Sequence, residues 1–206
     1  MKNTGQLIVI TGLSGSGKDT VIDNLLKRFP EFRRLITCTD RLPRDGEIHG
    51  VHYFFVKPKI LDLMHKSKEL VEVPLKYGTS RKATPKSEFH KVIYDGHKVI
   101  WRIDTSLAAK VATHCFFDEQ FTKYESRILK TISEVIFITS PKNTLHQRRK
   151  ARDKESYDPN DYKQRDNQDK SVLVQYKSVF SHVIVNENGK LKQTVDTITE
   201  IIGAET

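Results

Sequence analysis

Short apolar runs alternate with stretches of helical periodicity along most of this chain. The apolar runs predict buried strands at 6–11, 34–38, 98–103, 133–138 and 182–185. Apolar residues three or four positions apart predict helices at 19–28, 142–152, 160–179 and 190–202, with a shorter helix near 106–114. This alternation is typical of an α/β fold, so we expect a central parallel sheet with helices on both faces.

Residues 41–95 depart from the alternation. They contain short strand-like pieces at His52–Val56 and Leu70–Val73, and helical pieces near 57–66 and 85–94. We interpret this stretch as a small subdomain inserted into a single domain of 206 residues, whose core comprises 1–40 and 96–206. Residues 115–131 form an aromatic-rich insertion to which the pattern assigns no role.

The first predicted strand leads into a glycine-rich segment that matches the G-x-x-x-x-G-K pattern of a phosphate-binding loop, Gly12-Leu13-Ser14-Gly15-Ser16-Gly17-Lys18-Asp19-Thr20. Glycines let backbone N–H groups converge on phosphate oxygens, and the following helix N-terminus adds partial positive charge. Lys18 is expected to reach the outer phosphates. A glycine-rich turn without a ligand is the alternative, but the flanking strand and helix favour a phosphate site.

Asp19 follows the loop lysine where such loops carry Ser or Thr. The hydroxyl that would hold a metal ion is therefore missing, unless Thr20 or a water held by Asp19 replaces it. We expect the phosphates of a donor nucleotide to be bound by Gly12, Ser14, Gly15, Ser16, Gly17, Lys18, Asp19 and Thr20.

Charge and composition narrow the choice of partner. The formal net charge of +9 indicates anionic partners such as nucleotides, phosphorylated metabolites or nucleic acid. Nucleic acid is not expected, because aromatic and basic residues do not interleave and no zinc-finger spacing occurs. We expect no membrane span, since no apolar run approaches the roughly 18 residues of a span. We expect no signal peptide, since residues 1–6 lead directly into the first predicted strand. Two distant cysteines, Cys38 and Cys115, fit a reducing cytoplasm.

A second informative segment runs from Thr37 to Phe55 and contains Asp40-Arg41-Leu42-Pro43-Arg44-Asp45-Gly46-Glu47. Together with the phosphate loop, it resembles the guanylate kinase family, whose GMP-binding region reads T-R-x-P-R-x-G-E-x-x-G-x-x-Y-x-F; Asp40 stands where the family usually has Thr. The resemblance continues at Tyr77-Gly78-Thr79-Ser80, at Arg148 to Arg152 and at Val183-Ile184-Val185-Asn186. It implies phosphoryl transfer from ATP to a nucleoside monophosphate, with Mg²⁺ bridging the donor phosphates.

The monophosphate needs several hydrogen-bond donors, because it carries about two negative charges near neutral pH. Arg41 and Arg44 flank the rigid Pro43, so two guanidinium groups can hold one phosphate from two sides. Tyr53 and Tyr77 can each donate a hydroxyl proton to it. Matching positions in the family serve this purpose; a solvated basic loop with two core-facing tyrosines is the alternative.

Guanine selection is expected to depend on Glu72 and Thr37, with Thr79 as a further hydroxyl. One carboxylate accepts both N1–H and the exocyclic amine of guanine, whereas adenine would present a lone pair to it. The family places a glutamate at a matching point of a short strand, although the segment from Glu72 to Tyr77 is about four residues shorter here. The alternative is that Glu72 is a surface strand residue.

Phosphoryl transfer depends more on positive charge at the moving group than on a base. By resemblance, the catalytic cations are Lys18, Arg148, Arg152 and Arg165. Residues 149–163 are expected to form a lid that closes over the nucleotides. We interpret Arg149 and Lys150 as members of a solvated helix face.

The central strand departs from the family at one acid. Where the family usually reads D-x-D, this chain has Arg102-Ile103-Asp104, so only Asp104 remains as an expected substrate-binding residue. Arg102 could contact phosphate, pair with Asp104 or Asp19, or alter substrate choice. We predict a pair between Arg102 and Asp19; the alternative is that Arg102 points to the other face and reaches solvent.

These features predict an ATP-dependent kinase acting on GMP or dGMP, with ATP and GMP as small-molecule partners, Mg²⁺ as cofactor and no metal held by protein residues. The alternatives are ribose 1,5-bisphosphate phosphokinase or another monophosphate kinase of the same fold, and a non-catalytic guanylate-kinase-like binding module. Gly17-Lys18-Asp19 and the tail 188–197 resemble the first alternative, but the Arg41–Tyr53 segment does not. The retained Lys18 argues against the second. The sequence does not indicate an oligomeric state.

Overall fold

The computed structural model describes residues 5–77, 80–153, 167 and 170–203. The chain divides into two compact units, which are described separately: the first comprises Met1–Gln6 and Arg34–Val99, and the second Leu7–Arg33 and Ile100–Thr206. Among the described residues, no helix has the length and apolarity needed to cross a membrane.

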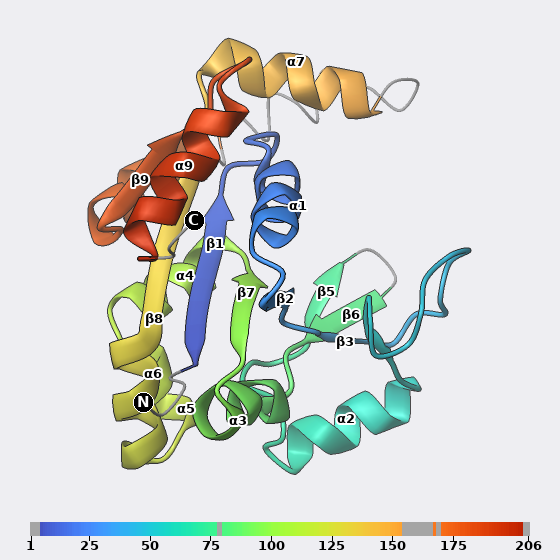
Figure 1. The fold of residues 1–206 in the computed structure, drawn as a ribbon. Coiled ribbons are helices and arrows are strands. Elements are labelled where there is room, and N and C mark those ends of the chain that lie inside the picture. Colours follow the sequence, from blue (N-terminus) through green and yellow to red (C-terminus); the bar gives the residue numbers. More distant parts are fainter. Residues whose placement is uncertain (1–4, 78–79, 154–166, 168–169, 204–206) are drawn as a thin grey trace. The chain divides into compact units, whose positions relative to one another are not determined.

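A five-stranded sheet forms the centre of the fold (Figure 1). Its strands lie in the order β2 (Phe32–Arg34), β7 (Lys98–Arg102), β1 (Gln6–Gly12), β8 (Ser133–Thr139) and β9 (His182–Val185). Strand β8 pairs in parallel with both β1 and β9. Helices separate these strands in the chain, which confirms the expected α/β fold with a parallel sheet.

One face of the sheet is covered by α1 (Lys18–Arg28) and α9 (Leu191–Ile201). Alternate residues of β1, Ile8 and Ile10, are completely buried in a core shared with Val21 of α1 and Ile198 of α9. Side chains alternate across a strand, so the residues between them must face the opposite side.

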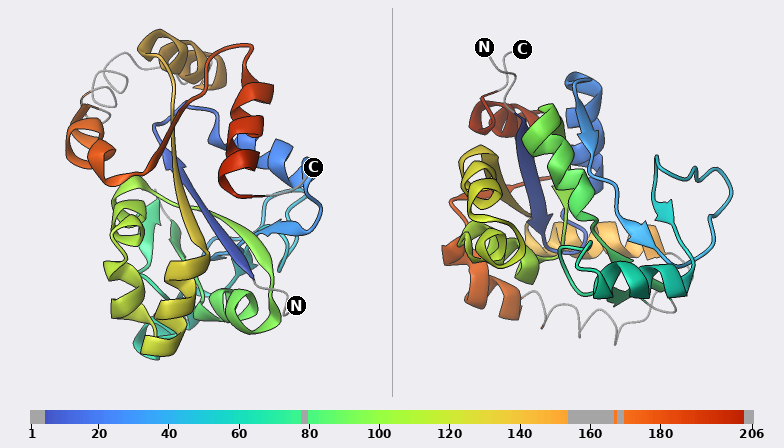
Figure 2. Two further views of the ribbon diagram at one scale, coloured as in Figure 1. Left: turned by 60° about the vertical axis from the view of Figure 1, so that its left-hand side comes forward. Right: turned by 90° about the horizontal axis from the view of Figure 1, so that it is seen from below.

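The opposite face is covered by α4 (Thr105–Ala112), α5 (Cys115–Gln120) and α6 (Lys123–Ile132) (Figure 2). Trp101 of β7 is buried there, with its ring 5.8 Å from that of Phe116. Residues 115–131 therefore form helices of the layer that covers this face. Helix α6 begins with a capping box between Thr122 and Glu125. The sequence analysis did not use this helix start signal.

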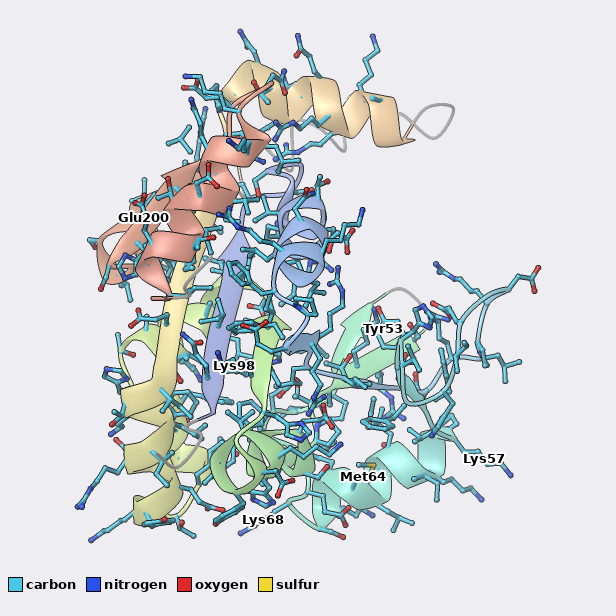
Figure 3. The ribbon with its side chains drawn as sticks, viewed as in Figure 1. Tyr53, Lys57, Met64, Lys68, Lys98 and Glu200 are labelled. Carbon is cyan, nitrogen blue, oxygen red and sulfur yellow. The ribbon has the colours of Figure 1, made fainter. Side chains whose placement is uncertain are left out.

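The first unit contains a four-stranded sheet in the order β4 (Phe54–Phe55), β3 (Cys38–Thr39), β6 (Ser80–Ala83) and β5 (Leu75–Tyr77). Helix α2 (Pro58–Lys66) packs on it through Leu61 and Met64 (Figure 3). Helix α3 (Lys86–Asp95) follows β6. Burial raises the pKa of the Cys38 thiol to about 12, so this cysteine stays protonated and acts as a core residue.

Two expected strands differ from the structure. The apolar run at 34–38 is divided between β2, which belongs to the five-stranded sheet, and β3, which belongs to the four-stranded sheet. Leu70–Val73 is not a strand: Leu70 makes only an isolated bridge to Pro85, and the strand begins later, at Leu75. Leu70 and Val71 are apolar because they are buried in the core, although they do not take part in a run of β-sheet hydrogen bonds.

Candidate active site

The phosphate loop, Gly12–Thr20, joins β1 to α1 in the second unit. Gly12 has a φ of 138°, and a Cβ atom there would lie 1.9 Å from the carbonyl oxygen of Ile138 on the neighbouring strand. Gly17 has a φ of 86°, and its Cβ atom would lie 2.6 Å from Nδ2 of Asn186. Both positions therefore require glycine for their conformation and for the space around them.

Side chains from two other elements hold the loop through the Ser16 carbonyl oxygen. Nδ2 of Asn186, just after β9, donates to this oxygen at 2.8 Å, and Nη1 of Arg148 donates to it at 3.2 Å. Arg148 belongs to α7 (Lys142–Asp153), and its Nε donates to Oδ1 of Asn188 at 3.1 Å. Burial lowers the pKa of the Arg148 guanidinium. Arg148 therefore contacts the loop backbone directly.

Arg149 also contacts the loop, contrary to our interpretation of it as part of a solvated helix face. Its side chain is completely buried, and its Nε donates to the carbonyl oxygen of Ser14 at 2.8 Å. The Cγ atom of Arg149 also packs where a Cβ atom of Gly15 would lie, at 3.1 Å. Helical periodicity did not predict this, because an arginine is seldom completely buried.

The loop fits a phosphate ligand by the polarity of its backbone. The arginines and Asn186 engage carbonyl oxygens, whereas the backbone N–H groups of Ser14, Gly15 and Gly17 have no hydrogen-bond acceptor within the described parts of the chain. The Ser16 hydroxyl is buried and likewise bonds to no described residue. Such donors at a helix N-terminus suit phosphate oxygens. Nζ of Lys18 donates to the carbonyls of Gly12 and Leu13, both at 2.8 Å, which holds the lysine against the loop.

The two unusual residues beside the loop form the predicted pair. Nε of Arg102, at the end of β7, lies 3.1 Å from Oδ1 of Asp19 in the first turn of α1. Asp104 has a different position: its Oδ1 accepts hydrogen bonds from the backbone N–H groups of Ser106 and Leu107, so it caps the N-terminus of α4. Its expected role in substrate binding stays a prediction.

The described residues contain no cluster of three or more His, Cys, Asp or Glu side chains suited to a metal ion. Asp19 is the acid nearest in sequence to the loop lysine, and its carboxylate is engaged with Arg102.

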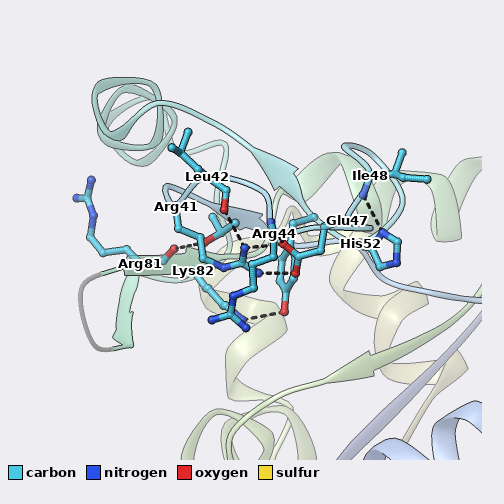
Figure 4. Close-up of polar contacts among 10 residues, drawn as sticks. Arg41, Leu42, Arg44, Glu47, Ile48, His52, Arg81 and Lys82 are labelled. Atoms are coloured by element: carbon cyan, nitrogen blue, oxygen red, sulfur yellow. Dashed lines mark hydrogen bonds and ion pairs between the residues drawn. The ribbon is translucent and has the colours of Figure 1, made fainter.

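In the first unit, Glu47 fixes the expected phosphate-binding arginine. Nη1 and Nη2 of Arg41 each donate to a different carboxylate oxygen of Glu47, both at 2.6 Å, and the backbone N–H of Arg44 donates to Glu47 at 2.8 Å (Figure 4). The hydrogen bonds from Arg41 lower the pKa of Glu47 to about 2. The Arg41 guanidinium also lies 5.2 Å from the centre of the Tyr53 ring. The structure thus brings Arg41 and Tyr53 together.

Asp40, which replaces the family's usual Thr, holds strand β6. Its two carboxylate oxygens accept hydrogen bonds from the backbone N–H and the Nε of Arg81, at 2.6 and 2.7 Å. Although partial burial opposes it, these bonds lower the pKa of Asp40. Arg81 also pairs with Asp62 of α2, so the substitution joins three elements of this unit.

The residues expected to select the base lie on the same unit. Oε1 of Glu72 accepts a hydrogen bond from the hydroxyl of Thr84 at 2.8 Å, which orients the carboxylate. Thr37 precedes β3, and its carbonyl oxygen accepts a bond from the N–H of Phe54. Glu72 is only partly exposed, unlike a typical surface strand residue.

Several expected site residues, or their side chains, lie outside the described parts of the structure. Thr79 and Arg165 lie outside the described residues, as does 154–163 of the expected lid. Tyr77 and Arg152 lie in β5 and α7, but only their backbone is described. Their expected roles stay predictions.

The sequence analysis missed Arg149, Asn186 and Lys82, whose Nζ donates to the hydroxyl of Tyr53 at 2.8 Å. Of these, only Asn186 carried a signal, as the last residue of a quoted family motif.

The comparisons with known proteins agree with these features. The family model for guanylate kinase matches residues 4–205. The chain is 32% identical to a guanylate kinase of Tropheryma whipplei over 74% of this chain and 72% of the relative. It is 29% identical to one of Corynebacterium diphtheriae over 96% of this chain and 94% of the relative. The crystal structure of a guanylate kinase from Anaplasma phagocytophilum has the same fold, with a TM-score of 0.62 and 19% identity over 99% of this chain and 87% of that chain. The fold, the phosphate loop and the match along nearly the whole sequence together show that the chain belongs to the guanylate kinase family.

Proposed function

We propose that this protein is an ATP-dependent guanylate kinase, which transfers the γ-phosphoryl group of ATP to GMP or dGMP and yields ADP and GDP or dGDP. The observation that carries the proposal is the combination of a phosphate loop that keeps Lys18 with an oriented pair of Arg41 and Tyr53. Both parts are needed, because one nucleotide supplies the phosphoryl group and the other accepts it.

The donor nucleotide is assigned to the loop Gly12–Thr20. Its N–H groups would bind the phosphates of ATP, with Lys18 supplying positive charge to the outer ones. Lys18 would exchange its bonds to the Gly12 and Leu13 carbonyls for bonds to phosphate oxygens. Mg²⁺, when bound with ATP, would neutralise part of the charge on the phosphates. Arg148, Arg152 and Arg165 are assigned to the phosphoryl group in transit.

The acceptor is assigned to the first unit. Arg41, Arg44, Tyr53 and Tyr77 would bind the phosphate of GMP, and Glu72 with Thr37 and Thr79 would select the guanine edge. Two features support this assignment: Glu47 presents Arg41 in a fixed direction, and Thr84 orients Glu72. A preorganised site loses less entropy on binding, which favours a specific acceptor.

The alternatives have less support. A ribose 1,5-bisphosphate phosphokinase has no base to select, which would leave the oriented Glu72 without a role in recognition. A non-catalytic binding module has no need for Lys18 or for a loop held by two arginines. We further propose that the protein is cytoplasmic and that residues 41–95 are an inserted subdomain. Residues 149–163 are proposed to form a lid, which would begin at Arg149, the residue that is bonded to the phosphate loop.

The test is an assay of ADP release with ATP and Mg²⁺ and a panel of acceptors: GMP, dGMP, AMP, CMP, UMP and ribose 1,5-bisphosphate. GMP and dGMP are expected to give the highest kcat/KM. Activity only with ribose 1,5-bisphosphate would replace the proposal with the first alternative, and no activity with any acceptor would favour the second.

A further inference from the structure

Lys82 of β6 is bound to the hydroxyl of a tyrosine that the proposed function assigns to the acceptor phosphate. Its Nζ lies 2.8 Å from Oη of Tyr53 and 4.4 Å from the centre of the Tyr53 ring. Residues alternate across a strand, so the neighbouring Arg81 is directed instead to Asp40 and Asp62. Lys82 and Arg41 both contact Tyr53 and belong to the cluster drawn in Figure 4.

The chemistry of the two groups fixes the direction of this hydrogen bond. A lysine ammonium group has three donors and no acceptor, so Nζ donates and Oη accepts. The proton of the Tyr53 hydroxyl therefore points away from Nζ and is available to another acceptor. A donor whose oxygen already accepts a bond from a cation is also polarised and donates more strongly. Tyr53 is thus prepared to donate to a further anionic group.

The charge distribution around Tyr53 favours a phosphate as that group. Two cations, Lys82 and Arg41, lie within 4.4 and 5.2 Å of the centre of one ring. Glu47 already offsets the charge of Arg41, whereas Lys82 donates to the neutral hydroxyl of Tyr53, so an anion beside this hydroxyl would be attracted by the Lys82 ammonium group. Both side chains are partly buried, which reduces screening by solvent.

We propose that Lys82 is a positioning residue of the acceptor-phosphate site, which acts by directing the hydroxyl proton of Tyr53 toward the phosphate of the nucleoside monophosphate. This inference rests on the proposed function and adds a residue to its substrate site. It requires Lys82 to affect recognition of the phosphate and not of the nucleoside.

The test compares the binding of GMP and of guanosine to the full chain by titration calorimetry. In Lys82→Met, the Kd for GMP is expected to rise about tenfold, the loss of one hydrogen bond in a charged network, while the Kd for guanosine stays unchanged. Lys82→Gln keeps an N–H donor without the charge and should lose less. Lys59→Met, which removes an exposed lysine of α2 in the same unit, is the matched control and should bind GMP as the natural protein does.

A second comparison tests whether Lys82 acts through Tyr53. In the Tyr53→Phe background, Lys82→Met should cause a clearly smaller loss of GMP affinity than in the natural protein, because the hydroxyl that Lys82 positions is already absent. Equal GMP affinity in Lys82→Met and the natural protein would overturn the proposal, as would an equal loss of guanosine affinity or full additivity with Tyr53→Phe. If the natural protein itself bound neither GMP nor guanosine, the proposed function would fail first and the role of Lys82 with it.

Discussion

The guanidinium of Arg149 donates to the carbonyl oxygen of Ser14 at 2.8 Å from a completely buried position in α7. This bond satisfies a backbone acceptor of the loop, whereas the N–H groups of Ser14 and Gly15 have no acceptor among the described residues and stay available to phosphate. We therefore predict that Arg149→Met lowers kcat/KM for ATP by about tenfold or more, because the loop would leave its phosphate-binding conformation rather than keep an unbonded buried carbonyl, which costs about 1–3 kcal/mol.

The effect of Arg149→Met on stability should be smaller than the effect on activity. Replacing a buried charge with an apolar side chain removes a desolvation cost, which offsets part of the lost hydrogen bond. Initial rates over a range of ATP concentrations, together with thermal unfolding, measure both. Lys150→Ala, which changes the exposed neighbour, serves as the control. An unchanged kcat/KM in a folded Arg149→Met variant would show that the loop keeps its conformation without this bond.

Lys18→Ala is predicted to abolish nearly all turnover. The variant loses the cation expected at the outer phosphates. It also loses two bonds to loop carbonyls at 2.8 Å, so a circular dichroism melt must accompany the assay of ADP release. Retained turnover in a folded variant would remove Lys18 from the mechanism.

Arg41→Ala and Arg44→Ala are each predicted to raise KM for GMP by about 10- to 150-fold, the equivalent of about 1.5–3 kcal/mol for a bond to a charged group. The KM for ATP should change little. Glu47→Gln should also weaken GMP binding, since it removes the charge that orients Arg41. A larger effect on ATP than on GMP in these variants would contradict the assignment of this segment to the acceptor.

The Arg41–Glu47 pair also predicts how stability and the KM for GMP depend on pH. Hydrogen bonds from Arg41 lower the pKa of Glu47 from 4.5 to about 2, so the carboxylate stays charged until the pH falls toward 2. Its contribution to folding is fully present above 4.5 and is lost as the pH falls from there through 2. The KM for GMP should therefore show no titration of Glu47 between pH 5 and 8, which a pH series on Glu47→Gln and the natural protein measures.

Glu72→Gln is predicted to reduce the preference for GMP over AMP. An amide can present its N–H₂ group to the acceptor at N1 of adenine, whereas the carboxylate cannot. The bond from Thr84 holds Oε1, so the substitution changes the chemistry of the group while its position is retained. Competition between GMP and AMP in one assay gives the ratio directly; an unchanged ratio would mean that another residue distinguishes the bases.

The sequence predicted those parts of the fold that depend on local patterns. Strand β1, helix α1 and helix α9 follow from apolar periodicity, and the phosphate loop follows from glycine spacing. Cys38 and Thr39 could not be separated from β2 in this way, because an apolar run does not reveal which sheet a strand joins. Helix α5 was hidden because its buried aromatic residues, Phe116 and Phe117, are adjacent and lack a helical period. Helix α6 was hidden because two of its three buried residues, Glu125 and Ser126, are polar.

Charge and motif together predicted the Arg102–Asp19 pair, which the structure confirms, while the site roles of Lys18 and Arg41 stay predictions. Arg149 and Lys82 were not predicted, for a physical reason. Each is recognised only by what it donates to, the Ser14 carbonyl or the Tyr53 hydroxyl, and these acceptors lie 135 and 29 residues away in sequence. The sequence around a basic residue does not indicate which distant hydrogen-bond acceptor it will contact.

The last prediction concerns the pair of Arg102 and Asp19, whose side chains are 50% and 60% exposed. At this exposure the pair should contribute only about 0.2–1 kcal/mol to stability, and less at high salt. Its effect on turnover should be larger, because Asp19 lies in the first turn of α1 beside the loop. Without Arg102, the Asp19 carboxylate would repel the phosphates of ATP more strongly. We therefore expect Arg102→Asp to impair GMP phosphorylation strongly, and Asp19→Ser to impair it less.

The double variant distinguishes a functional pair from two independent residues. Because Arg102→Asp creates two neighbouring acids, removing one of them with Asp19→Ser should restore part of the lost activity. The double variant should then be less impaired than the product of the two single effects, a coupling measured from kcat/KM for ATP at low and high salt. The coupling should shrink at high salt, as it must for a half-exposed pair. Simple additivity at both salt concentrations would show that the 3.1 Å contact has no role in catalysis and would leave the assignment to the kinase family unaffected.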